Sequence, residues 1–360
     1  MQVFKAKKLV LVAIIGYSVP VSGMELKNPN IPSLFIGGHF SVGAIKGQTE
    51  SLSINSLSPR INLVSIQSLT DTLWIEAKGE WGVNSLGGSD SFATRLGYIA
   101  LAHDSNGSIV FGKQWSPYYV AGGVADKPIA FANEFLYDNQ GPLGTARADS
   151  MISYTNIYQF ADFISFKFGF GWQGASVTSY TKDSGSTEHS YDLGQRVQTL
   201  LAYEVSEVSI NYAFSSGNIS SATEELIPEE EEASSHLFSV SYGQYGTGVY
   251  LAGVIALNSY MNSYNEQLLS DTKAYEAILA YGLSNGLNVS LNSEWLLNES
   301  STAQEFESGT VVYATAALQV EYDIDRRLRG YGGYQLDLQG TGSFKESKDN
   351  ILMLGVRFFL

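Results

Sequence analysis

Apolar and polar residues alternate along most of this chain, in segments separated by short polar stretches. The last segment shows the pattern most clearly, because one of its faces carries Arg357 and the other is formed by Leu352, Leu354, Val356, Phe358 and Leu360. Successive side chains of a β-strand point to opposite faces, so this alternation predicts strands with one apolar face. No long stretch outside the N-terminus keeps a helical period.

The same pattern predicts an all-β fold of sixteen strands. The expected strands are 33–46, 56–68, 71–82, 91–102, 107–116, 148–156, 161–175, 193–205, 206–217, 234–245, 246–260, 271–282, 285–297, 309–323, 326–337 and 347–360.

Two kinds of connection separate these strands. Tight turns are expected at 70–71, 104–107, 284–286 and 323–325, and long polar loops at 118–147, 182–192, 218–235 and 298–308. Short turns at one end and long loops at the other are typical of a transmembrane β-barrel. A soluble periplasmic β-sandwich or β-helix is the alternative, but a sandwich calls for shorter strands around a closed apolar core.

The composition agrees with a barrel and excludes several other classes. Only 16% of the 360 residues are charged, and mean hydropathy is −0.03. A helical membrane protein needs runs of about 20 apolar residues, and only the N-terminus approaches such a run, so a bundle of membrane helices is excluded. Cys is absent, which excludes a disulfide scaffold and a thiol nucleophile, and the formal charge of −15 argues against a nucleic-acid partner. No cofactor motif is present, and the four His are scattered without metal-site spacing.

The first residues resemble a secretory signal peptide. Lys5, Lys7 and Lys8 precede the apolar run Leu9–Ile15, and Val21–Gly23 offers small residues for cleavage. We expect a signal peptide over residues 1–23 and a barrel domain over residues 24–360.

The long connection 117–147 stands out because structureless loops beyond about 12–15 residues are usually functional or disordered. This one contains Tyr118, Phe131, Phe135 and Leu136, so it must pack against something. A barrel of about sixteen strands encloses an aqueous lumen that can hold such a loop. We therefore expect it to fold into the lumen and narrow the pore.

Aromatic residues gather where the strands are expected to end, as in the girdles of membrane barrels. The expected girdle residues are Tyr118, Tyr119, Tyr154, Tyr158, Phe160, Phe163, Tyr260, Tyr264, Tyr331 and Tyr334.

The stretches 107–117, 133–138 and 144–154, together with the C-terminal strand, resemble motifs of the trimeric general porins of Gram-negative outer membranes. Residues 107–117 are similar to the family's fifth strand entering its third loop, and residues 144–154 to the strand that leaves that loop. Residues 133–138 are similar to the tip of that loop, with Glu134 and Asp138 at the family's spacing. The C-terminal strand resembles the family's assembly signal. The resemblance covers essentially the whole mature chain and implies a homotrimeric outer-membrane channel.

The resemblance also implies a cluster of arginines on the wall that faces the loop acids. Arg60, Arg95 and Arg147 match members of that cluster. An independent argument agrees, because an Arg that faces lipid at the bilayer midplane costs about 2–4 kcal/mol and strand arginines should therefore face the lumen. The expected constriction residues are Arg60, Arg95, Arg147, Glu134 and Asp138, with Asp126 and Lys113 as weaker candidates.

The expected function is passive diffusion of small hydrophilic solutes and ions through a water-filled channel in the cell outer membrane, without a reaction or cofactor. The negative net charge suggests a bias toward cations, but the arginine cluster opposes it, so a weak preference for cations at most is expected. One alternative is a channel selective for sugars or other nutrients, for which a count of eighteen strands is open. A second is an outer-membrane lipid hydrolase, for which His39 and Ser41, on one strand face, are the candidate base and nucleophile. Membrane lipid and lipopolysaccharide are the other expected partners, although the acidic run Glu229–Glu232 reads more simply as a solvated loop.

Overall fold

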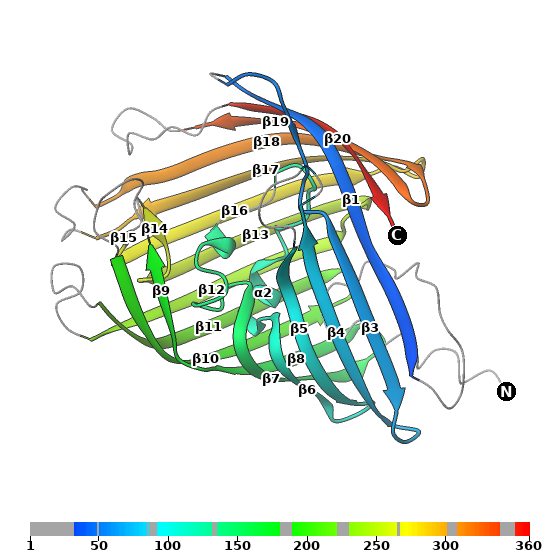
Figure 1. The fold of residues 1–360 in the computed structure, drawn as a ribbon, viewed down its shortest axis with the longest axis vertical. Helices are drawn as coiled ribbons and strands as arrows, with labels where there is room; N and C mark the ends of the chain where they lie inside the picture. The colour runs from blue at the N-terminus through cyan, green and yellow to red at the C-terminus, as the bar shows by residue number, and fades with distance from the viewer. Residues whose placement is uncertain are drawn as a thin grey trace.

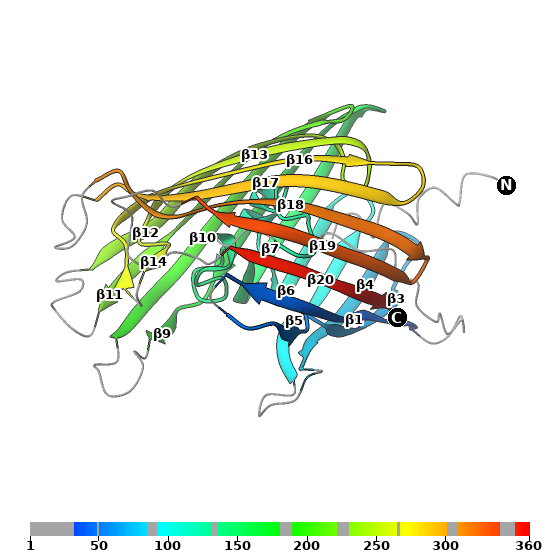
Figure 2. The ribbon, with the colours of Figure 1, turned by 90° about the horizontal axis from the view of Figure 1, so that it is seen from above.

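The computed structural model describes residues 32–48, 50–84, 86, 92–131, 135–180, 189–221, 230–264, 267–300, 308–338 and 350–360. The expected signal peptide lies outside the described residues. The long strands run side by side around a closed wall (Figures 1 and 2). Within the described part of the chain, no helix has the length and apolar character needed to cross a membrane.

The wall contains sixteen antiparallel strands, as the sequence predicts. They are β1 (Ser33–Gly47), β2 (Ser53–Asn55) with β3 (Arg60–Ser68), β4 (Leu73–Val83), β5 (Phe92–His103), β6 (Gly107–Trp115), β7 (Arg147–Ala161), β8 (Ile164–Gln173) with β9 (Ser176–Tyr180), β10 (His189–Val205), β11 (Val208–Ser221), β12 (Glu231–Gln244), β13 (Thr247–Ser259), β16 (Asp271–Gly282), β17 (Leu287–Asn298), β18 (Thr310–Asp325), β19 (Leu328–Asp337) and β20 (Ile351–Phe359).

Two of the sixteen wall strands are interrupted, and each consists of two shorter strands. The sheet therefore contains eighteen strands at sixteen positions around the barrel. Both β2 and β3 pair with β1, and both β8 and β9 pair with β10. The first and last strands close the barrel, with Phe40 opposite Phe358 and Lys46 opposite Leu352. The expectation of a sixteen-stranded barrel is confirmed, and the eighteen-stranded alternative is wrong.

Connections alternate between short and long along the wall, as expected. The turn between β5 and β6 is closed by Gly107, and that between β16 and β17 by Gly286, both with positive φ. The expected turn at 323–325 is wrong, because β18 continues to Asp325 and the chain reverses at Arg326 and Arg327. The expected loop 218–235 is shorter, because β11 extends to Ser221 and β12 begins at Glu231.

The two faces of the wall differ in chemistry. Leu352, Leu354, Val356 and Phe358 of β20 are exposed on the outside, whereas Met353 is buried on the inside. Strand β16 repeats the pattern, with Leu279 outside and Glu276 inside. The outer surface of the described wall is thus an apolar belt, as lipid contact requires.

Aromatic side chains are exposed just before several short turns. Those on the outer face near these turns include Tyr158, Phe160, Phe163, Tyr203, Tyr242, Tyr281 and Tyr322. Such a ring matches the aromatic girdle of membrane barrels. Three expected girdle residues do not belong to it, because Tyr118, Tyr119 and Tyr331 are buried.

The connection 117–147 contains regular structure that the sequence pattern did not predict. It begins with helix α2 (Pro117–Gly122) and includes the one-turn helix η1 (Phe135–Tyr137). Ser116 caps α2 by accepting a hydrogen bond from the Tyr119 amide at 3.0 Å, and Pro117 occupies its first turn. A second connection, between β13 and β16, carries the small hairpin β14 (Ser263–Tyr264) and β15 (Gln267–Leu268).

Candidate functional site

The segment 117–147 packs against the inner face of the wall formed by β10, β11 and β12. Leu200, Ala213 and Leu237 of β10, β11 and β12 are buried together with Tyr118 and Leu136. Burial of this apolar surface holds the segment on one side of the barrel.

Hydrogen bonds attach the same segment to the wall at widely separated points. The Tyr118 hydroxyl lies 2.8 Å from Ser235 Oγ on β12, and the Phe135 amide donates to Glu294 on β17 at 2.8 Å. Farther along, the Phe131 amide donates to Gln319 on β18 at 2.8 Å. These contacts span residues that are more than 100 positions apart in the chain, so sequence pattern could not reveal them.

Glycines on β8 make room for the start of α2. A Cβ added to Gly171 would lie 3.2 Å from Pro117 Cγ and 3.3 Å from Met151 Sδ. A Cβ added to Gly169 would lie 3.1 Å from Leu200 Cβ. The absence of side chains at these two positions lets the helix lie directly on the sheet.

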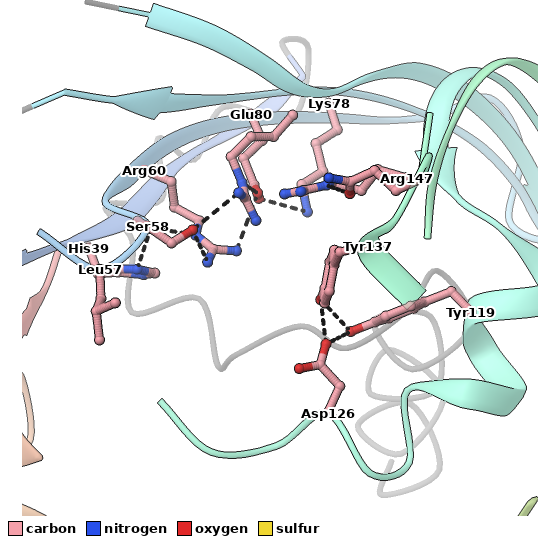
Figure 3. Close-up of polar contacts among 12 residues, drawn as sticks. His39, Leu57, Ser58, Arg60, Lys78, Glu80, Tyr119, Asp126, Tyr137 and Arg147 are labelled. Carbon is pink, nitrogen blue, oxygen red and sulfur yellow. Dashed lines mark hydrogen bonds and ion pairs between the residues drawn. The ribbon is translucent and has the colours of Figure 1, made fainter. Parts of the chain in front are cut away.

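Two of the expected arginines meet around an acid that the sequence pattern did not single out. Glu80 of β4 is buried, and its Oε1 lies 3.0 Å from Arg95 Nε and 3.5 Å from Arg60 Nη1. Lys78 Nζ lies 3.9 Å from the other carboxylate oxygen. Three cations therefore share one carboxylate on the inner wall (Figure 3).

The interruption between β2 and β3 places Ser58 among these arginines. Ser58 has a left-handed backbone, with φ of 49°, and its Oγ accepts hydrogen bonds from Arg60 and Arg95, each at 3.1 Å. Its carbonyl lies 3.0 Å from His39 Nε2. Left-handed geometry at a residue other than Gly is often associated with functional sites.

Arg147, the third expected arginine, lies on the same side at the start of β7. Its Nε donates to Gln140 at 2.8 Å, and its guanidinium lies 5.5 Å from the Trp115 ring and 5.6 Å from the Tyr137 ring. Lys113 of β6 forms an ion pair with Asp149 at 2.7 Å. A shared hollow includes Arg95, Lys113 and Arg147 in its lining.

The loop presents an acid to this wall. Asp126 accepts hydrogen bonds from the hydroxyls of Tyr119, at 2.6 Å, and Tyr137. Burial raises the pKa of Tyr119 and of Tyr137 above the usual value of about 10, and the Asp126 carboxylate is the second cause. Both hydroxyls therefore remain protonated donors at neutral pH and above it. Figure 3 shows Asp126 and its two tyrosines opposite Arg60, Glu80 and Arg147.

The other two expected acids have different positions. Asp138 is bound by the backbone amide of Ser263 at 2.5 Å and by its hydroxyl at 2.9 Å, in the connection between β13 and β16. Glu134 lies outside the described residues. The described part of the loop therefore brings one expected acid, Asp126, to the side that faces the arginines.

Sequence reasoning missed Glu80, Ser58, Tyr119 and Tyr137 as members of the site. A signal for Glu80 was present, because Glu76, Lys78 and Glu80 occupy alternate positions of one strand and must share a face. The tyrosines gave no comparable signal.

His39 and Ser41 lie on the inner face, each engaged with another group. Ser41 Oγ accepts a hydrogen bond from Arg357 Nε at 2.9 Å, and His39 Nε2 lies against the Ser58 carbonyl at 3.0 Å. A serine hydrolase instead needs the hydroxyl bonded to the imidazole. These contacts and the inward position do not support lipid hydrolysis. Among the described residues, no group of three or more His, Asp or Glu has an arrangement that suits a metal ion.

No protein-family model matches the chain, and no curated protein matches its sequence. Solved structures do match it. OmpF of Salmonella typhi, solved as a complex with daunomycin, is 17% identical with a TM-score of 0.74, over 94% of this chain and 100% of that one.

Two further matches are similar in extent. An anion-selective porin from Comamonas acidovorans is 13% identical with a TM-score of 0.66, over 91% of this chain and 100% of that one. The outer membrane channel DcaP of Acinetobacter baumannii is also 13% identical with a TM-score of 0.66, over 93% of this chain and 99% of that one. The chain therefore has the sixteen-stranded barrel fold of the outer-membrane porins.

Proposed function

We propose that this protein is a diffusion channel of a Gram-negative outer membrane that passes small hydrophilic solutes and ions without a chemical reaction. The observation that carries the proposal is the opposition of the two wall faces. Leu354 and Leu279 lie on an exposed apolar belt, whereas Glu80, Arg95 and Arg147 face inward from the same barrel. Lipid outside and water inside account for both faces.

The segment 117–147 is the proposed constriction. Its apolar side packs on β10–β12, and its polar side carries Asp126 toward the basic wall. Opposite charges across a narrow waist produce a transverse field, in which polar solutes can orient and apolar solutes lose ordered water. Arg60, Arg95 and Arg147 on the wall, with Asp126 and Glu134 on the loop, are the proposed selectivity residues. Asp138 is proposed to position the loop.

Export by the N-terminal signal, assembly as a homotrimer and contact with lipopolysaccharide complete the proposal. Each rests on the sequence motifs and on the resemblance to general porins.

A channel selective for sugars is the competing function. Tyr119 and Tyr137 supply aromatic faces beside the site, but both hydroxyls are already bound to Asp126.

Planar-bilayer recording tests the function directly. The purified wild-type protein should form stable open channels, and a trimer should close in three equal steps. Arg95→Ala or Asp126→Ala should change unitary conductance or ion preference. Block of the ion current by maltose at millimolar concentration would instead support a sugar channel, and the absence of any conductance would refute the proposal.

A further inference from the structure

The hollow beside the basic wall has an unusual composition. Its lining combines three cations with hydroxyl and amide groups and contains no carboxylate among the described residues. The polar lining residues are Ser56, Ser58, Asn84, Thr94, Arg95, Lys113, Gln140 and Arg147.

Positive charge exceeds negative charge around this hollow. Arg60, Lys78 and Arg95 share the single carboxylate of Glu80. Lys113 has its own partner, Asp149, at 2.7 Å. Five cations, counting Arg147, therefore meet two carboxylates within this group of contacts.

Two further acids of the described wall and loop accept hydrogen bonds from tyrosines and do not line the hollow. Glu76, which precedes Lys78 on β4, accepts a hydrogen bond from Tyr98 at 2.9 Å. Asp126 is bound by two tyrosine hydroxyls on the loop side. Neither carboxylate lines the hollow.

Arg147 is held in a geometry that suits a ligand. Gln140, a neutral group, accepts from its Nε, and the rings of Trp115 and Tyr137 lie 5.5 and 5.6 Å from the guanidinium carbon. Its Nη1 is buried and has no hydrogen-bond partner among the described residues. A guanidinium fixed in this way presents unused donors that match the two oxygens of a phosphate or carboxylate.

We propose that this hollow is a binding subsite for small oxyanions, held by Arg147, Arg95 and Lys113 together with the hydroxyl of Thr94, and that the channel consequently favours anions over cations. This inference rests on the proposed channel function and names its substrate class: solutes that carry a phosphate or a carboxylate group.

The inference departs from the cation preference that the net charge of −15 favours. The reason is the location of the acids. Glu230, Glu231 and Glu232 are exposed at the beginning of β12, on a different side of the barrel from the hollow. Salt screens exposed charges beyond about 8 Å at physiological ionic strength, so the groups beside the solute path decide its preference.

Two measurements test the subsite in the intact protein in planar bilayers. The first is the reversal potential in a KCl gradient, which should show that chloride is more permeant than potassium. The second is the block of chloride current by inorganic phosphate and, in a parallel arm, by succinate. Block by phosphate alone identifies a phosphate site, and block by both identifies a general oxyanion site.

Arg147→Gln should weaken this block roughly tenfold, which corresponds to about 1.4 kcal/mol. Arg147→Lys keeps the charge and should preserve the anion preference while losing part of the block, because Lys lacks the planar fork. Arg326→Gln, in the short turn after β18, is the matched control for loss of one positive charge and should leave the block unchanged.

The outcomes separate the two proposals. A conducting wild-type protein that prefers potassium, or that phosphate and succinate fail to block, overturns the subsite and leaves the channel function in place. Equal weakening of the block in Arg147→Gln and Arg326→Gln also overturns the subsite. Failure of the wild-type protein to conduct at all overturns the channel function itself.

Discussion

Asp138 of the loop 117–147 is bound twice by Ser263, through the backbone amide at 2.5 Å and the hydroxyl at 2.9 Å. Ser263 belongs to a different connection, between β13 and β16. Its neighbour Asn262 is buried and is bonded to Thr272 and Asn258 on the wall. A second inward-packed connection therefore ties the proposed constriction loop to the barrel.

Loss of this tie should make the channel unsteady. Asp138→Asn removes the charge that strengthens both hydrogen bonds, each worth about 1.5–3 kcal/mol when one partner is charged. We expect more frequent brief closures and higher open-channel noise in single-channel recordings. Ser308→Ala, at an exposed position of another long connection, should behave like the wild type. If Asp138→Asn has the same closure frequency and open-channel noise as the wild type, the contact between Asp138 and Ser263 does not restrain the loop.

Removal of the shared acid should shift ion preference toward anions. Glu80→Gln leaves Arg60, Arg95 and Lys78 without their common carboxylate. The reversal potential in a KCl gradient should therefore move further toward that of chloride. Glu76→Gln is the control, because Glu76 accepts a hydrogen bond from Tyr98, whereas Glu80 pairs with Arg60 and Arg95. Equal shifts in the two variants would mean that only the total charge matters.

A side chain at Gly171 should displace helix α2. Its Cβ would lie 3.2 Å from Pro117 and 3.3 Å from Met151, so a valine leaves little room for either neighbour. Gly171→Val should lower the free energy of unfolding by about 1–3 kcal/mol, as overpacking does. At Gly174 the nearest atom to a new Cβ is 3.9 Å away, so Gly174→Val should cost less. Urea titration in detergent micelles compares the two.

A charge on the outer belt should oppose insertion. Leu354 lies in the middle of β20 and is 59% exposed on the outer face. Leu354→Arg should lower the free energy of unfolding in lipid vesicles by about 2–4 kcal/mol. Leu354→Met, which keeps the volume and the apolar character, should cost less than about 1.5 kcal/mol. Equal stabilities for the two variants would contradict lipid contact at this face.

The loop tyrosines predict a dependence on alkaline pH. Burial and Asp126 raise the pKa of Tyr119 and of Tyr137 in the folded protein, whereas both ionise near pH 10 in the unfolded chain. The stabilisation from their hydrogen bonds is therefore complete below about pH 10 and is lost as the pH rises above that value.

Absorbance at 295 nm during an alkaline titration measures this effect. The folded wild-type protein should show a late phase of tyrosine ionisation that shrinks in Tyr137→Phe. A late phase of undiminished size in Tyr137→Phe and in Tyr119→Phe would contradict the assignment.

The sequence by itself determined the barrel. Apolar and polar residues alternate because successive side chains of a strand point to opposite faces. This local rule was enough to count sixteen wall strands and to place Leu354 outside and Arg357 inside. Turn residues such as Gly107 and Gly286 marked the short connections, because positive φ favours Gly. The resemblance of a few motifs added Arg60, Arg95 and Arg147 as inward-facing candidates.

Only the tertiary structure decided what these residues face. The meeting of Arg60 and Arg95 at Glu80 depends on strand register and on the interruption that turns Ser58 inward. The position of Asp138 depends on a contact with Ser263, 125 residues away in the chain. A loop without a repeating period carries no local signal of its partners, because its conformation is set by the wall on which it packs.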